Sequence, residues 1–287
     1  MSDALQLRPM TAPEVEQLVA WAAGEGWNPG LDDCRSFFEV DPDGFMAAEI
    51  NGEMIGGGAI IRHHASFGFM GLFIVRADYR GHGIGRTLWY ARRDRLAARL
   101  GPDGTIGMDA VPAMREFYAR GEFRESGLSV RFRLDGAAPT LDDSFRTVPV
   151  SAIPREQLAE FDRSCFPSPR DQYLRVWIAQ PHSRTFAAVE NGTLRGYAVT
   201  RRCGTGWKVG PLFADHRDVA RGLFQSCWET AEGTPVFLDV PEGNPQAIAM
   251  ANEFGMVPGF NCMRMYRGPE PAVQLERVYG ITTFELG

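Results

Sequence analysis

The sequence predicts a protein of the α/β (α+β) class, made of two tandem domains that are each a mixed, mostly antiparallel sheet flanked by helices. Its 287 residues are long for one such domain and sufficient for two of about 140 residues. Short apolar runs typical of strands alternate with helical patterns in both halves. The second half also repeats segments of the first at a spacing of 140 positions. A period of that length indicates two domains.

The repeat is clearest in two hairpins. Residues 47–56 (AAEINGEMIG) align with residues 187–196 (AAVENGTLRG), and each reads as a strand, an Asn-Gly turn and a second strand. Asn-Gly favours the positive φ angles of a type I′ turn. We interpret the matches as a duplication, because further pairs follow in the same order. These are Leu72-Phe73 with Leu212-Phe213 and, after a deletion, residues 108–112 with residues 238–241.

The first half contains the elements of one such domain. Its first helix is expected after Thr11, which can act as the N-cap, with Pro13 in the first turn and Glu14 completing a capping box. The other elements follow from apolar periodicity. The expected strands are Leu5–Pro9, Gly44–Ile50, Met54–His64, Gly68–Val75, Thr105–Asp109 and Leu128–Leu134, and the further helices are Ile84–Leu100 and Ala113–Arg120.

The second half is expected to repeat this plan from Arg146 to Arg267. Residues 136–143, with Pro139 and two aspartates, read as a linker. The predicted domains are therefore residues 1–135 and residues 144–287. The second domain ends in a tail whose segment Val278–Leu286 is expected to add a strand.

Composition narrows the classes of function. The longest apolar stretches are too short to span a bilayer, and the N-terminal residues lack the pattern of a signal peptide. The five cysteines are scattered and form no CxxC pair, which favours reduced thiols over disulfides or a zinc site. A net charge of −6 argues against nucleic acid as a partner. We therefore expect a cytoplasmic protein with no metal, no membrane contact and no nucleic-acid partner.

The most informative stretch is residues 71–87, GLFIVRADYRGHGIGRT. An apolar strand runs into a loop with glycines at 81, 83 and 85, and a helix follows at once. The unpaired N–H groups and the positive dipole at a helix N-terminus suit a pyrophosphate. Arg80 and Arg86 can add charge-assisted hydrogen bonds. The loop matches neither the dinucleotide GxGxxG fingerprint nor a P-loop.

The segment from Arg80 to Gly85 resembles the (Arg/Gln)-x-x-Gly-x-(Gly/Ala) signature of the GNAT (GCN5-related) N-acetyltransferase superfamily. This resemblance implies transfer of an acetyl group from acetyl-CoA to a primary amine, by direct attack on the thioester. It implies that the pantetheine arm pairs with the backbone of the fourth strand, and that the loop amides hold the pyrophosphate. The cofactor-binding residues so assigned are Phe73, Ile74, Val75, Arg80, Gly81, His82, Gly83, Ile84, Gly85 and Arg86.

Residues 117–123 (FYARGEF) resemble the Tyr-x-x-x-Gly-Phe end of the last helix in the same family. There the tyrosine lies near the thioester and can protonate the departing thiolate. The resemblance assigns that role to Tyr118. Two positions depart from the pattern, since Glu122 stands where glycine is usual and Val111 where asparagine is frequent. A tyrosine with only a packing role is the alternative.

The acceptor site of the family lies between its first two helices, where Glu25, Trp27 and Asn28 interrupt the chain. These residues can bind an amine by stacking and charge, or Trp27 can simply pin a turn. No residue stands out as general base, and the family also uses water relays. The candidates are Asp109, His63, His64 and Glu25, each with an ordinary structural role as the alternative.

The second half lacks the features of the site. Residues 210–224 (GPLFADHRDVARGLF) have no alternating glycines, and Ala251 aligns with Tyr118. Asn244 and Ala247 keep the Asn-x-x-Ala pattern of the family, which fits shared descent. We expect one working domain and one degenerate domain that walls the acceptor pocket. Rival readings are another acyl-CoA donor, a hydroxyl acceptor, or a non-catalytic acetyl-CoA sensor or assembly module; the oligomeric state is left open.

Overall fold

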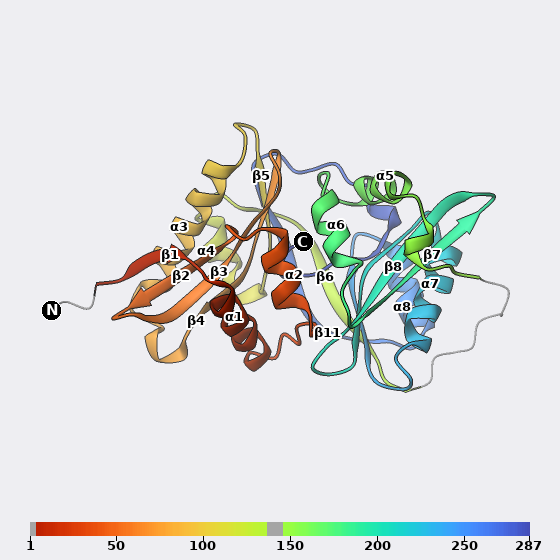
Figure 1. The fold of residues 1–287 in the computed structure, drawn as a ribbon, viewed down its shortest axis with the longest axis horizontal. Coiled ribbons are helices and arrows are strands. Elements are labelled where there is room, and N and C mark those ends of the chain that lie inside the picture. Colours follow the sequence, from red (N-terminus) through yellow and green to blue (C-terminus); the bar gives the residue numbers. More distant parts are fainter. Residues whose placement is uncertain (1–3, 137–145) are drawn as a thin grey trace.

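A single sheet of twelve strands runs through the molecule and joins its two halves (Figure 1). A computed structural model describes residues 4–136 (the first half) and 146–287 (the second half). The linker expected at residues 136–143 therefore lies outside the described residues, apart from Gly136. The strand order is β1-β2-β3-β4-β5-β11-β6-β10-β9-β8-β7, and β12 pairs with β9 off this path.

The elements follow the predicted order in both halves. The first half contains β1 (Gln6–Pro9), α1 (Ala12–Gly24), α2 (Asp33–Val40), β2 (Phe45–Ile50), β3 (Glu53–His64), β4 (Phe67–Val75), α3 (Ile84–Arg99), β5 (Thr105–Ala110), α4 (Arg115–Ala119) and β6 (Arg124–Leu134). The second half contains α5 (Arg155–Cys165), α6 (Asp171–Trp177), β7 (Ser183–Glu190), β8 (Thr193–Arg202), β9 (Trp207–Ala214), α7 (Arg217–Glu229), β10 (Val236–Pro241), α8 (Pro245–Glu253), β11 (Val257–Arg267) and β12 (Val278–Gly280).

Local sequence signals form the structures expected of them. The carboxylate of Glu14 accepts a hydrogen bond from the Thr11 backbone N–H at 2.8 Å, so the capping box of α1 is confirmed. Both Asn-Gly hairpins have two successive positive φ angles, 54° and 81° at residues 51–52 and 51° and 77° at residues 191–192. These angles are the ones that a type I′ turn requires.

Two elements are shorter than the sequence predicts. The helix expected at Ala113–Arg120 is α4, Arg115–Ala119, because a 3₁₀ turn at Pro112–Met114 takes up its start. The strand expected at Val278–Leu286 is β12, Val278–Gly280. It ends there because the next residue, Ile281, donates its N–H to the backbone carbonyl of Asp239 on β10 at 2.9 Å. The chain therefore leaves its pairing with β9.

Two strands, β6 of the first half and β11 of the second, each cross to the other half. β11 pairs with β5 and β6, while β6 pairs with β11 and β10, all antiparallel. β11 therefore lies against β5 and β6 lies against β10, each a strand of the opposite half, at the centre of the molecule (Figure 1). The sequence treats Leu128–Leu134 as the end of the first domain. In the structure this strand starts at Arg124 and pairs only with strands of the second half.

Each exchanged strand carries an arginine that forms a buried ion pair with an aspartate on the strand it meets. Arg264 of β11 binds both carboxylate oxygens of Asp109 on β5, at 2.7 and 2.8 Å. Arg131 of β6 binds both oxygens of Asp239 on β10, at 2.6 and 2.8 Å. Asp109 and Asp239 are counterparts in the sequence repeat. The duplicated ion pairs therefore hold both exchanged strands in place. We call the central region where β5, β11, β6 and β10 pair the seam.

One hydrophobic core is common to both halves. The helices α1, α2, α5 and α6 cover one face of the sheet and share a continuous cluster of buried side chains. Within it, Phe37 of α2 stacks on Trp177 of α6 with ring centroids 6.1 Å apart. On the other face, α3 and α4 cover the first half, and α7 and α8 cover the second. Because the first core spans the seam, neither half keeps all its buried apolar surface when separated.

Breaking one of these buried ion pairs should destabilise the folded protein. Arg264→Met is expected to lower the free energy of unfolding by about 3–5 kcal/mol, because it leaves the fully enclosed Asp109 carboxylate without its counter-charge. Arg267→Met on the same strand is the matched control. Its partner Glu122 is exposed, so the expected loss is below about 1 kcal/mol. Guanidinium unfolding measures both, and equal small losses would show that the seam does not depend on the buried pair.

Candidate active site

A cavity opens in the first half where two parallel strands separate. Residues Phe67–Met70 of β4 pair with residues Thr105–Met108 of β5, and beyond these residues the two strands diverge. The space between them has a volume of about 460 Å³. Its walls come from the end of β4, the loop before α3, α4 and the seam with the second half.

A bulge in β4 borders this space. Gly71 pairs with Ala59 of β3 and Ile74 pairs with Gly57, so Leu72 and Phe73 together oppose one residue. Leu72 has a φ of 49°, a left-handed value that is rare for a branched residue. Because β5 has already diverged, the backbone of the bulge has no neighbouring strand on that side. This stretch of β4 is therefore available to a ligand that lies along it.

The glycine loop connects β4 to the N-terminus of α3. Gly83 is the N-cap of α3 and has a φ of 80°, which favours glycine. The Arg80 guanidinium donates to the Val75 carbonyl at 2.7 Å and to Glu25 at 2.5 Å, so it holds the loop against the end of β4 and the chain after α1. The first N–H groups of α3 are left without helical partners, as at every helix start.

The structure brings most of the predicted cofactor-binding residues to the cavity or its rim. The cavity is lined by Phe73, Ile74, Val75, Arg80, Gly81 and Gly85. Gly83 lies between the last two in the loop. His82 and Arg86 are exposed beside it, with the Arg86 guanidinium 5.9 Å from the Tyr90 ring centroid, and Ile84 is buried in the core beneath α3.

Tyr118 lies on the cavity wall, where α4 presents it. Its ring is only 6% exposed and lies 5.6 Å from the Trp89 ring, centroid to centroid. Burial raises the pKa of the Tyr118 phenol to about 12, against the opposing charge of Arg92. A phenol is protonated at neutral pH even at its ordinary pKa, and burial favours that form further, so Tyr118 holds a proton that it can donate.

Arg92 is a site residue that the sequence analysis missed. Its buried guanidinium donates to the carbonyls of Ala59 and Gly71, at 2.5 and 2.6 Å, and so ties α3 to both strands beside the bulge. Burial lowers its pKa to about 10, which leaves it charged at neutral pH. A signal existed, because Arg92 lies between Leu88 and Leu96 at the four-residue spacing of the buried helix face.

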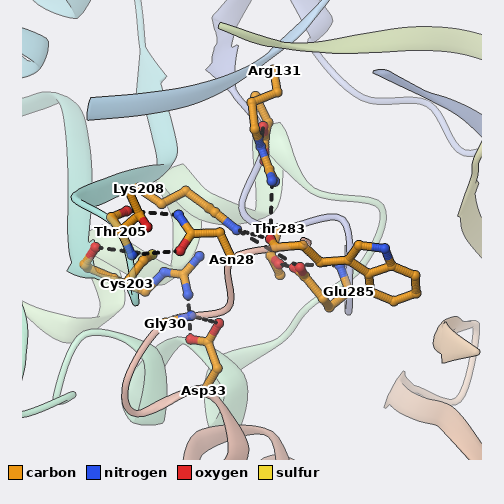
Figure 2. Close-up of polar contacts among 12 residues, drawn as sticks. Asn28, Gly30, Asp33, Arg131, Cys203, Thr205, Lys208, Thr283 and Glu285 are labelled. Atoms are coloured by element: carbon orange, nitrogen blue, oxygen red, sulfur yellow. Dashed lines mark hydrogen bonds and ion pairs between the residues drawn. The ribbon is translucent and has the colours of Figure 1, made fainter. Parts of the chain in front are cut away.

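The second half clamps the segment that the sequence assigned to the acceptor (Figure 2). The Asn28 carboxamide accepts from the Thr205 N–H at 2.9 Å and donates to the Thr205 carbonyl at 2.8 Å. The Trp27 carbonyl accepts from Arg131 at 3.2 Å and from Lys208 at 3.4 Å. Glu25 and Trp27 line the cavity, whereas Asn28 lies outside its lining. The amide of Asn28 is engaged in holding the segment in place.

The second half also supplies part of the cavity wall, as the sequence predicts, although the sequence did not indicate which residues do so. Phe260 and Cys262 come from β11, and Phe284 and Glu285 come from the C-terminal segment, defined here as residues 281–287. This segment passes directly against the bulge. A Cβ atom added to Gly71 would lie 1.7 Å from the Glu285 carbonyl oxygen, so only glycine permits the approach.

The four candidates for general base are placed differently. Asp109 lines the cavity but both its oxygens bind Arg264, and Glu25 binds Arg80 at the rim. His63 lies outside the lining, and its Nε2–H donates to the Leu286 carbonyl at 2.8 Å. Burial lowers the pKa of His63 to about 3, so it is neutral. His64 is exposed and contacts the Ser66 hydroxyl.

The equivalent gap of the second half is filled by the chain itself. Residues Trp207–Val209 of β9 pair in parallel with residues Val236–Leu238 of β10. The two strands then diverge, as β4 and β5 do. There β12 pairs with β9, with Val278 opposite Phe213 and Gly280 opposite Leu212. Leu212 and Phe213 are the repeat counterparts of Leu72 and Phe73. The two halves thus keep the same strand geometry, and only the first keeps it open.

Comparison with known families assigns both halves. Residues 12–121 match the acetyltransferase (GNAT) family, and residues 158–280 match a second acetyltransferase (GNAT) domain. The chain belongs to the GNAT superfamily. Its β4 bulge, glycine loop and open gap are therefore features of a GNAT acyltransferase fold, present in tandem.

Relatives of this GNAT protein share its two-domain length. A protein named holothin acyltransferase, from Pseudoalteromonas sp. (strain SANK 73390), is 26% identical over 98% of this chain and 94% of its own. A crystal structure from Pyrococcus horikoshii is 23% identical, covers 100% of this chain and 97% of its own, and has a TM-score of 0.83. A tandem GNAT protein from the clavulanic acid biosynthesis pathway is 18% identical, with a TM-score of 0.67 and coverage of 94% and 100%. These two structures support the fold.

Two kinds of feature are absent from the described residues. Across residues 4–136 and 146–287, no helix has the length and apolar character needed to cross a bilayer. Over the same residues, no group of three or more His, Cys, Asp and Glu side chains is arranged to hold a metal ion.

Proposed function

We propose that this GNAT protein transfers an acetyl group from acetyl-CoA to a primary amine, on a small molecule or a peptide N-terminus, in the first half only. The observation that carries the proposal is the gap between β4 and β5, with a bulge at Leu72, a glycine loop at one end and a protonated Tyr118 on the wall. The five cysteines are free thiols, which fits the reducing conditions of a cytoplasm.

The residues present fit acetyl-CoA as co-substrate. The unpaired edge of Phe73–Val75 offers backbone groups to the pantetheine arm, and the loop of Gly81–Gly85 with the start of α3 offers N–H groups to the pyrophosphate. When bound, acetyl-CoA supplies an activated acetyl carbonyl. The wall residues Leu72, Phe73 and Tyr118 then surround that end of the cavity.

The chain contributes position, polarity and a proton. The backbone N–H groups at the bulge can donate to a carbonyl oxygen, and Arg92 holds the bulge in place through the Gly71 carbonyl. Tyr118 is protonated at neutral pH, and it acts as the general acid for the leaving sulfur. The amine attacks directly, and proximity within the cavity supplies much of the rate.

The acyl group and the acceptor are tested in one assay. Release of free thiol is followed with acetyl-CoA and longer acyl-CoA donors, because the relative of similar length is named an acyltransferase. The acceptors are polyamines, amino acids, aminosugars, arylalkylamines and peptide N-termini. Robust turnover with an amine supports the proposal. Binding of acetyl-CoA with no turnover of any amine would favour a sensor or assembly role.

A charge in the glycine loop should abolish co-substrate binding. Gly83→Glu places a carboxylate at the N-cap of α3, where the proposed pyrophosphate lies, and we expect no measurable heat in acetyl-CoA titration calorimetry. Gly233→Glu is the matched control, because Gly233 also has a positive φ and open space around it but lies in the second half. Equal affinity of the Gly83 variant and the wild-type protein would exclude the loop from binding.

Removal of the Tyr118 proton should slow the chemical step. Tyr118→Phe keeps the ring that packs on Trp89 but deletes the hydroxyl, so kcat is expected to fall by about 10²–10⁴-fold. Acetyl-CoA affinity should change little. A variant with wild-type kcat would leave Tyr118 with a packing role alone.

Acetyl-CoA should bind once per chain. β12 occupies the gap of the second half along Leu212 and Phe213, so the strand edge that would receive a second pantetheine arm is already paired. Calorimetry on the intact protein is expected to give a stoichiometry of one. Two equivalent sites would show that β12 leaves the gap and that the second half binds co-substrate as well.

A further inference from the structure

We propose that Glu285 binds the ammonium group of the acceptor and takes its proton, so that the C-terminal segment of the second half forms the acceptor subsite of the first. This inference rests on the proposed function and adds a residue and an acceptor class to it. The segment enters the first half after β12 has closed the gap between β9 and β10. One stretch of chain thus closes one site and completes the other.

Glu285 lies where an attacking nitrogen must arrive. Its backbone carbonyl packs against Gly71, the residue before the bulge at Leu72, and its side chain is only 5% exposed. Glu285 belongs to the cavity lining. The segment is held there from both sides. Thr282 accepts a hydrogen bond from Arg170 at 2.9 Å, and the Leu286 carbonyl accepts one from His63 at 2.8 Å.

Glu285 is the cavity-lining carboxylate that is least neutralised by a cation. Glu25 binds Arg80, and Asp109 binds Arg264 through both oxygens. The Glu285 carboxylate accepts from the Thr283 hydroxyl, and its nearest cation is the Lys208 ammonium at 4.0 Å (Figure 2). Among the described residues, no arginine or lysine nitrogen lies within hydrogen-bond distance of it. It therefore keeps acceptor capacity for an incoming ammonium.

Charged and titratable groups on every packed element face Glu285. Arg131 is engaged by Asp239, and Arg201 by Asp33, so two of the cations near Glu285 are already paired. The groups in electrostatic reach are Lys208 of β9, Arg131 of β6, Arg201 of β8, Asp109 of β5, Tyr173 of α6, Cys203 and Cys262.

The other walls select the kind of amine. Trp27, Phe73, Phe260 and Phe284 line the cavity and offer apolar faces and π-systems to a flat group. The one available carboxylate, that of Glu285, can bind one ammonium group. A polyamine would place its further positive charges near the cations Arg92 and Arg131, which would repel them. The expected acceptor is therefore a monoamine that carries an aromatic or similarly flat apolar group.

Two residues, Glu285 and Tyr118, accept and donate the protons of the transfer. The acceptor ammonium gives one proton to the Glu285 carboxylate, and the free amine forms its bond to the acetyl carbon. The carbon–sulfur bond breaks, and the leaving sulfur takes a proton from Tyr118. The nitrogen loses its second proton, which restores Tyr118 through solvent, and Glu285 releases its own proton to water.

The test is Glu285→Gln, assayed with 2-phenylethylamine and with spermidine across neutral and alkaline pH. We expect kcat/KM for 2-phenylethylamine to fall about 100-fold near pH 7. The loss should shrink as pH rises, because the free amine then needs no base. Acetyl-CoA affinity should stay unchanged, and the wild-type protein should prefer 2-phenylethylamine to spermidine. The matched control is Glu276→Gln, an exposed carboxylate just before β12, which should behave as wild type.

The possible outcomes separate the two proposals. A wild-type protein that turns over no amine contradicts the proposed function itself. Amine turnover in which Glu285→Gln keeps the wild-type kcat/KM and pH profile overturns only the role of Glu285, as does a uniform loss at all pH values. If the Gln variant does not fold, Thr283→Val decides, since it removes the hydroxyl that orients the carboxylate. It should raise the KM for the amine several-fold, and an unchanged KM overturns the inference.

Discussion

The exchange of β6 and β11 is the constraint on which the rest of the structure depends. β11 pairs with β5 and β6 pairs with β10, and each is held there by a bidentate Asp–Arg pair, Asp109 with Arg264 and Asp239 with Arg131. Such pairs contribute little net stability in place of apolar contacts, but breaking one leaves a buried charge. They therefore specify which strand lies where, and so bring the second half to the edge of the first cavity.

The duplicated halves use one geometry in two ways. In each, two parallel strands separate and leave a strand edge unpaired. An unpaired edge inside a protein needs hydrogen-bond partners. The second half provides them with β12, whereas the first half leaves its edge facing a cavity of about 460 Å³. The same requirement for backbone pairing thus explains a closed site and an open one.

The C-terminal segment and the chain after α1 both contribute to the cavity wall. The segment packs against Gly71, and the chain after α1 is tied to the second half through Asn28, the Trp27 carbonyl with Lys208, and the Asp33–Arg201 pair. Both sets of contacts depend on the relative position of the two halves, which the strand pairing at the seam fixes. The acceptor side is therefore a product of the interface between the halves, and a change in the seam is expected to alter it before it alters the glycine loop.

The sequence by itself determined the features that are encoded within a few residues. These are the capping box at Thr11, the Asn-Gly turns, the glycine loop and the order of the elements, because each depends on local backbone geometry or on helix and strand periods. Tertiary structure alone decided which strands are neighbours, since an alternating pattern states which face of a strand is buried but not what it pairs with. For that reason the exchange of β6 and β11, the use of Asn28 as a clamp, and the arrival of Glu285 beside Gly71 were not visible in the sequence. Each joins residues that are far apart in the chain, and only folding brings them together.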